Sequence, residues 1–102
     1  MIRVGQYEFD GPIYHTASLC RAAGVYAILD NRGSSGYFVL DIGQSESIRD
    51  RIEDHERDSC WRKNRRGRIG IATLYLPQST SALRCRIETR LRWQFMPTCG
   101  VR

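Results

Sequence analysis

Residues 24–42 read GVYAILDNRGSSGYFVLDI, and this stretch decides the fold. Two apolar, partly β-branched runs, 24–29 and 37–42, flank a segment rich in Gly and Ser. Such an arrangement is typical of a β-hairpin. If the turn is centred between Gly33 and Ser34, the antiparallel register places Tyr26 directly opposite Asp41 on one face. A slip of one residue would put these two side chains on opposite faces, so their pairing depends on the loop geometry.

A helix is expected after the hairpin, with Ser45 or Ser47 as its cap. On this helix one stripe at i, i+3, i+4 and i+7 comprises Ile48, Arg51, Ile52 and His55. A stripe that faces the core is normally apolar throughout. The Arg and the His on this stripe therefore indicate a functional site at the edge of the helix.

The second half of the chain predicts a third strand and a longer helix. Alternating residues from Ile69 to Leu76, ended by Pro77, indicate the strand. Ser79, Thr80 or Ser81 is then expected to cap a helix whose core-facing stripe is Leu83, Ile87, Leu91 and Phe95. Pro97 is expected to end this helix, and Glu88 lies beside its apolar stripe.

These elements predict an α+β fold with a small three-stranded antiparallel sheet flanked by helices. The length of 102 residues is that of a single domain. We expect residues 24–100 to form its core and residues 1–23 an N-terminal extension. That extension would hold a short strand over Arg3–Phe9 and an irregular region ending at Ala23.

The charge of the chain indicates a polyanionic partner. Its formal net charge is +5. The cations gather in two stretches, of which the first follows Trp61 and contains Arg62, Lys63, Arg65, Arg66 and Arg68, and the second contains Arg84, Arg86, Arg90 and Arg92. Two basic clusters in so small a domain resemble an electrostatic footprint for phosphates, so we expect a nucleic acid to bind here. Trp61 is either a platform on which a base stacks or a residue of the core.

The cysteines and the hydropathy indicate the cellular compartment of the protein. The four cysteines, Cys20, Cys60, Cys85 and Cys99, form no CxxC pair. We expect them to be reduced, small buried hydrophobic residues; the alternative is a zinc site that uses Cys60 and Cys99. No apolar run approaches the roughly 20 residues that cross a bilayer. The N-terminus lacks the pattern of a secretory signal, and the sequence therefore predicts a cytoplasmic protein without membrane contact.

Five sequence features occur in an order that resembles the GIY-YIG endonuclease superfamily. They are Gly24-Val25-Tyr26 on one strand, Asp41-Ile42-Gly43-Gln44-Ser45 at the end of the next, Arg51 and His55 after it, and Glu88 on a later helix. The resemblance covers Gly24 to Gly100. It implies a three-stranded antiparallel sheet and a site that hydrolyses phosphodiester bonds, mostly in DNA, with one divalent metal.

The resemblance also implies a role for each site residue. Tyr26 would orient or deprotonate a water molecule, and Arg51 would hold the phosphate. His55 would assist proton transfer or bind phosphate. Glu88 would ligate Mg²⁺ or Mn²⁺, since a carboxylate is the hard oxygen ligand that these ions prefer.

Three positions depart from the family pattern. Asp41 replaces the tyrosine of the second motif, Gln44 a basic residue that some relatives carry, and Gly100 the asparagine after the last helix. Asp41 would either accept the phenol proton of Tyr26 and add a carboxylate to the metal site, or repel phosphate. The sequence thus favours a metal-dependent endonuclease-like domain acting on DNA, with a catalytically degenerate nucleic-acid-binding module on the same fold as the alternative.

Overall fold

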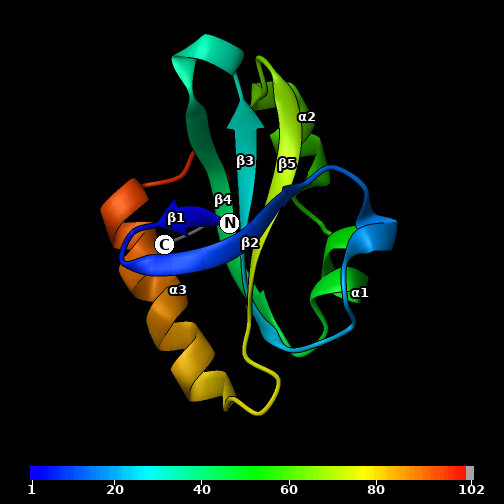
Figure 1. Ribbon diagram of the computed structural model, residues 1–102, viewed down its shortest axis with the longest axis vertical. Helices are drawn as coiled ribbons and strands as arrows, with labels where there is room; N and C mark the ends of the chain where they lie inside the picture. Colours follow the sequence, from blue (N-terminus) through cyan, green and yellow to red (C-terminus); the bar gives the residue numbers. More distant parts are fainter. Residues whose placement is uncertain (101–102) are drawn as a thin grey trace.

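The computed structural model describes residues 1–100, which form one five-stranded sheet with helices on both faces (Figure 1). The strands are β1 (Ile2–Val4), β2 (Tyr7–Ile13), β3 (Gly24–Asn31), β4 (Tyr37–Ser45) and β5 (Arg68–Tyr75). The helices are α1 (Ile48–Glu53), α2 (Asp58–Asn64) and α3 (Ser81–Phe95), with short 3₁₀ turns at Thr16–Ser18 and Gly33–Ser35. No helix within the described residues is long and apolar enough to cross a membrane.

The sheet has the strand order β1-β2-β5-β3-β4, and all its neighbours are antiparallel. The predicted α+β class is correct, but the predicted three-stranded sheet is wrong. Residues 1–23, expected to be an extension, add β1 and β2 beyond β5. The strand β1 pairs with β2 in a local hairpin, and β2 joins the rest of the sheet by pairing with β5 through Asp10 and Ile13.

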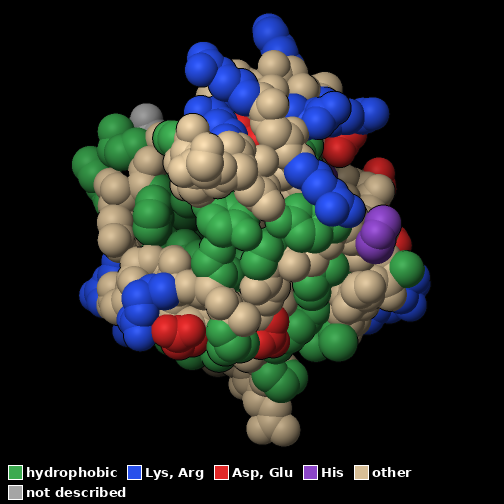
Figure 2. All heavy atoms as spheres, turned by 45° about the horizontal axis from the view of Figure 1, so that its top comes forward, with side chains coloured by type: hydrophobic (Ala, Val, Ile, Leu, Met, Phe, Trp, Pro, Cys, Tyr) green, Lys and Arg blue, Asp and Glu red, His purple; other side chains and the backbone are tan. Residues whose placement is uncertain are grey.

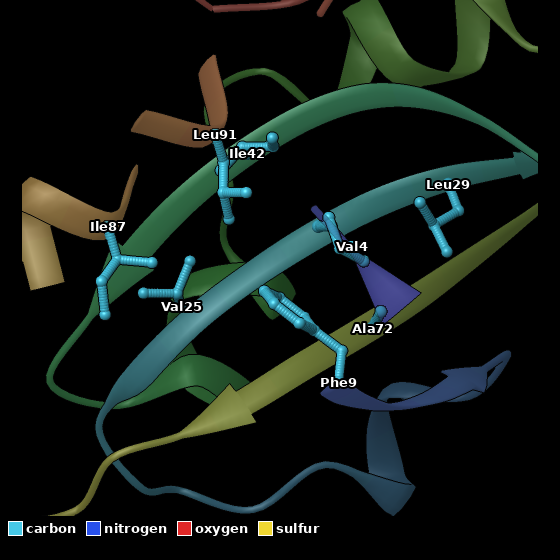
Figure 3. Packing of buried hydrophobic residues seen from close by; sticks show 9 residues of the cluster. Val4, Phe9, Val25, Leu29, Ile42, Ala72, Ile87 and Leu91 are labelled. Carbon is cyan, nitrogen blue, oxygen red and sulfur yellow. The ribbon is translucent and has the colours of Figure 1, made fainter. Parts of the chain in front are cut away.

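The central strand β3 is buried on both faces, which explains its uninterrupted apolar sequence. Its alternate residues enter two separate cores. One core lies under α3, where Ile87 and Leu91 point at Val25 and Ile42 while Phe9 closes it from β2 (Figure 3). The other lies under α1 and α2 and contains Tyr26 and Ile28 with Ile48, Ile52 and Trp61. The sheet therefore separates α3 from the pair α1 and α2.

The helices α1 and α3 follow their predicted positions with two corrections, whereas α2 was not predicted. Thr80 caps α3 as expected, since its Oγ1 accepts from the amide of Leu83 over 3.1 Å. The side chain of Leu83 is not in the core; it is 40% exposed. The helix α1 ends at Glu53, so the predicted helical stripe does not extend to His55, which lies in the turn before α2.

Candidate functional site

Tyr26 lies across Gly43 of the neighbouring strand. The two residues are register partners in the β3–β4 ladder. A Cβ atom at position 43 would lie 2.2 Å from the Tyr26 hydroxyl oxygen, so only glycine leaves room for the ring. The ring points to the side of the sheet that α1 and α2 cover, and Tyr26 is 1% exposed. Gly43 thus leaves the space in which the Tyr26 ring packs.

The predicted pairing of Tyr26 with Asp41 is wrong, because the register differs in two places. The hairpin pairs Asn31 with Tyr37, and a β-bulge lies farther along, where Leu29 faces Val39 but Ile28 faces Asp41. A bulge adds one residue to one strand and re-aims the side chains beside it. The partner of Tyr26 is therefore Gly43 instead of Asp41.

His55 contacts the Tyr26 hydroxyl directly. Its Nε2 lies 2.6 Å from the phenol oxygen, and its Nδ1 accepts a hydrogen bond from the Arg57 amide over 3.0 Å. A neutral imidazole carries one proton, so the amide bond to Nδ1 places that proton on Nε2. His55 therefore donates to Tyr26, and the phenol hydrogen is left to point at another acceptor.

Both members of this pair are uncharged at neutral pH. Burial lowers the pKa of His55 to about 4, assisted by the nearby Arg51 and Arg57. Burial also raises the pKa of the Tyr26 phenol to about 12, assisted by the charge of Asp41. The pair thus presents a phenol held by a neutral imidazole donor.

Arg51 is the cation of this cluster that solvent reaches most easily. It lies on α1, near enough to Tyr26 that its charge favours the phenolate and acts to lower the pKa of the phenol. Its Nη2 donates to Glu56 over 3.1 Å, and its side chain is 32% exposed. Glu56 is 68% exposed and can be displaced by a phosphate, so Arg51 is accessible to a ligand. We call Tyr26, His55 and Arg51 the tyrosine cluster.

Asp41 is fully buried and is the centre of a polar network. Within the described chain its Oδ2 accepts from Arg57 Nε over 2.7 Å and from Trp61 Nε1 over 2.8 Å. Its Oδ1 accepts from Arg92 Nη2 over 2.6 Å and from the amide of Ile42 over 2.8 Å. These donors occupy the lone pairs of the carboxylate. Asp41 therefore positions its neighbours, and it is not arranged to bind a metal or to take the Tyr26 proton.

Gly100 also belongs to this network. A Cβ atom at position 100 would lie 2.6 Å from both terminal nitrogens of Arg92. The guanidinium of Arg92 thus occupies the space beside the position where the resemblance led us to expect asparagine. Arg57 and Arg92 were not among the predicted site residues. Arg92 was predicted only as one of the second group of cations that would contact a polyanion; the structure instead buries it, as it does Arg84.

Glu88 lies on α3 between two arginines that bind β4. One turn before it, Arg84 donates to Gln44 over 2.9 Å, and one turn after it, Arg92 binds Asp41. Glu88 itself accepts from Arg92 Nε over 3.4 Å, and its side chain is 24% exposed. The hydrogen bonds and ion pairs of the described residues join Glu88 to Arg92 and not to Tyr26, His55 or Arg51, so the structure does not bring the fourth predicted site residue into contact with the other three.

Few side chains of this region could ligate a metal ion. In residues 1–100 no three His, Cys, Asp or Glu side chains come together as a metal cluster. Mg²⁺ in phosphoryl chemistry keeps several waters and uses one or two carboxylates together with substrate phosphate. Glu88, with its single long ion pair, fits the role of such a carboxylate, whereas Asp41 does not.

The cysteines correct two expectations. Cys60 and Cys99 form a disulfide, so they are neither reduced thiols nor zinc ligands. Cys20 and Cys85 are free and exposed, not buried. The disulfide joins α2 to the segment after α3, next to the Asp41 network.

Trp61 does not provide a stacking platform. It is 3% exposed, its indole nitrogen binds Asp41, and its ring lies 4.5 Å from the His55 ring. Of the two alternatives for this residue, the core position is therefore correct. Trp61 packs the tyrosine cluster from the side of α2.

The predicted basic loop is only partly a loop. Arg62 and Lys63 lie on α2, Arg65 and Arg66 follow it, and Arg68 begins β5. All five are exposed. Figure 2 shows Lys and Arg side chains gathered on the end of the molecule that is turned forward. Arg62 and Lys63 lie on the side of the sheet that holds the tyrosine cluster, whereas Arg68 points to the other side, where its guanidinium lies 4.0 Å from the Tyr14 ring centroid.

No protein-family model matches the chain, and neither a curated protein nor a solved structure is significantly similar to it.

Proposed function

We propose that this chain is a metal-dependent phosphodiesterase of the GIY-YIG type that acts on nucleic acid, with Tyr26, Arg51, His55 and Glu88 as its working residues. The observation that carries the proposal is the hydrogen bond of 2.6 Å between His55 and the Tyr26 hydroxyl. The amide of Arg57 fixes the direction of that bond. A buried tyrosine with an oriented hydroxyl and a neighbouring arginine suits the recognition of a phosphate oxygen.

The chemistry of the tyrosine cluster follows from its donors. Tyr26 accepts from His55, and its own hydrogen is directed to a phosphoryl oxygen or to the attacking water. When that hydrogen shifts toward the ligand, His55 and Arg51 both stabilise the negative charge on the phenol oxygen. Such preorganised donors, aimed at a site of developing charge, typically contribute about 10²–10³ in rate.

Arg51 is the residue that holds the phosphate. Two oxygens of a phosphodiester can take the place of Glu56 as partners of its planar guanidinium, in the paired geometry that arginine favours. Because Tyr26 is nearly inaccessible, the phosphate reaches the cluster through Arg51.

Glu88 is the carboxylate that would hold the divalent metal. A bound Mg²⁺ or Mn²⁺ supplies positive charge for the phosphoryl oxygens and lowers the pKa of a bound water. The ion pair of 3.4 Å to Arg92 orients the Glu88 carboxylate on α3. The exposed cations of α2 and the following loop then attract the polyanion toward this site.

A second candidate function, a nucleic-acid-binding module without catalysis, is favoured by one specific observation. Tyr26 is 1% exposed, and its access depends on moving Arg51 away from Glu56. If that exchange does not occur, the exposed cations bind nucleic acid and the tyrosine cluster is a structural core.

The test is cleavage of supercoiled and single-stranded DNA with Mg²⁺, with Mn²⁺ and with EDTA. Tyr26→Phe removes the phenol hydrogen, and Glu88→Gln removes the carboxylate charge. Matched controls are Tyr37→Phe and Glu53→Gln, whose side chains lie at the exposed hairpin tip and on α1. Metal-dependent nicking that both site variants lose and both controls keep supports the nuclease. Salt-sensitive binding without nicking by the unmodified protein supports the binding module instead.

A further inference from the structure

A pocket of about 530 Å³ lies at the tip of the β3–β4 hairpin, away from the tyrosine cluster. It is bounded on one side by the hairpin and on the other by the loop that follows α2. Its lining residues are Asn31, Arg32, Ser35, Phe38, Arg66 and Gly67. Two cations and one aromatic ring thus face the same hollow.

The buried carboxylate of Asp30 holds the walls of this pocket in place. Asp30 is fully buried, and it accepts from Arg32 Nε over 2.7 Å, from the Arg66 amide over 2.8 Å and from the Gly67 amide over 2.7 Å. Burial alone would raise the pKa of Asp30, but these hydrogen bonds hold it below the usual value. The carboxylate therefore fixes Arg32 on one wall and the backbone of Arg66 on the other.

Phe38 gives the pocket a flat apolar surface. The Phe38 ring on β4 is 43% exposed, so its apolar surface is open to a ligand. The Arg32 guanidinium lies 4.0 Å from the ring centroid, in a cation–π contact. Within residues 1–100, Arg66 makes no ion pair through its side chain. A stacked ring with an adjacent unpaired cation is the combination that proteins use to bind a nucleotide of a single strand.

We propose that this pocket binds one unpaired nucleotide of the nucleic-acid ligand, with its base stacked on Phe38 and Arg32 and its phosphate held by Arg66. This inference rests on the proposed function and adds a substrate class to it. A base inside a duplex has both faces covered by its neighbours, so the pocket selects single-stranded or locally unpaired nucleic acid.

The pocket lies where a single nucleic-acid strand bound in it could also reach the tyrosine cluster. Asp30 lies four residues from Tyr26 on β3, which corresponds to about 13 Å along a strand. At about 3.4 Å per nucleotide, this distance spans roughly four stacked nucleotides. Both side chains point to the same side of the sheet, and the exposed Arg62 and Lys63 of α2 lie on that side.

The test compares two ligands of equal length in a fluorescence anisotropy titration: an oligothymidine and an abasic phosphodiester chain. Phe38→Ala should weaken binding of the oligothymidine by about 5- to 100-fold and leave binding of the abasic chain unchanged. Arg66→Gln should weaken both ligands. Leu83→Ala on α3 and Arg3→Gln on β1 are matched controls, because they remove an exposed apolar and an exposed cationic side chain elsewhere.

The outcomes separate this inference from the proposed function. If both pocket variants bind oligothymidine as the unmodified protein does, the pocket is not a nucleotide site, and nicking that depends on Tyr26 still supports the nuclease. If Phe38→Ala weakens both ligands equally, the stacking is overturned. If the unmodified protein binds neither ligand, the pocket inference is overturned, and the proposed nuclease is judged by the nicking of supercoiled DNA.

Discussion

Arg92 reaches around the edge of the sheet to Asp41, and its Nη2 donates to Oδ1 over 2.6 Å. The two residues start on opposite sides, because Arg92 belongs to α3 while Asp41 is enclosed by Trp61 and Arg57. This contact is open to Arg92 only because β4 is the edge strand. One buried carboxylate thereby joins α3, β4 and α2.

Asp41→Asn should destabilise the fold strongly. The amide would keep the shape of the side chain but would remove the buried negative charge that Arg92 and Arg57 share, leaving them only the longer ion pairs to Glu88 and Glu56. Breaking a buried ion pair in this way costs about 3–5 kcal/mol. Urea denaturation measures the loss, with the exposed Asp10→Asn as the control. A loss below about 1 kcal/mol would show that the network contributes little beyond packing.

Gly43→Ala should also destabilise the fold, through a clash with Tyr26. The added Cβ would lie 2.2 Å from the hydroxyl and 2.4 Å from the ring carbon that carries it. Overpacking of a core usually costs about 1–3 kcal/mol. The control is Gly70→Ala, whose Cβ would meet side-chain atoms no closer than 3.0 Å and should cost less.

A double-mutant cycle checks that the clash is with Tyr26. Tyr26→Val removes the ring, so in its presence Gly43→Ala should lose most of its effect on the free energy of unfolding. Additive losses from the two substitutions would contradict the contact between Tyr26 and Gly43.

The sequence predicted the central part of this fold because its signals are local. The apolar runs on either side of the Gly-rich segment identified β3 and β4, and alternation ended by Pro77 identified β5. The same local signals could not locate β1 and β2. The pairing of these strands with the rest of the sheet is long-range, and β2 meets β5 at only two ladder positions, Asp10 and Ile13.

Three of the candidate residues that the sequence selected lie together in the structure, but their contacts were not predictable. Tyr26, Arg51 and His55 were selected together, and the structure brings them together. Their geometry depends on a bulge at Leu40 and on the end of α1 at Glu53, which tertiary packing decides. Asp41 was misplaced for the same reason, since one extra residue in β4 changes its partner on β3.

The stability of the protein should fall between pH 6.5 and pH 4 because of His55. The folded-state pKa of about 4 lies below the ordinary value of 6.5, so the unfolded chain binds this proton first as the pH falls. The free energy of unfolding therefore rises with pH in this window, by up to about 3 kcal/mol in total. Thermal denaturation across this range measures the effect.

His55→Gln keeps a donor for Tyr26 but cannot titrate, so it should flatten this pH dependence. His15→Gln is the control, because His15 is exposed and its replacement should leave the profile unchanged. A profile that stays equally steep in His55→Gln would show that another group titrates in this window.

Reduction of the Cys60–Cys99 disulfide should lower the melting temperature without abolishing the fold. The bond closes a loop with a sequence separation of 39, for which the chain-entropy model gives about 4 kcal/mol. The segment after α3 keeps other contacts, since the Cys99 amide donates to Leu40 over 2.8 Å and its carbonyl accepts from Arg92. Cys60→Ser, Cys99→Ser and the double variant should therefore match the reduced protein in thermal denaturation. Cys20→Ser and Cys85→Ser should match the oxidised protein. Four reactive thiols in the unreduced, denatured protein would contradict the disulfide itself.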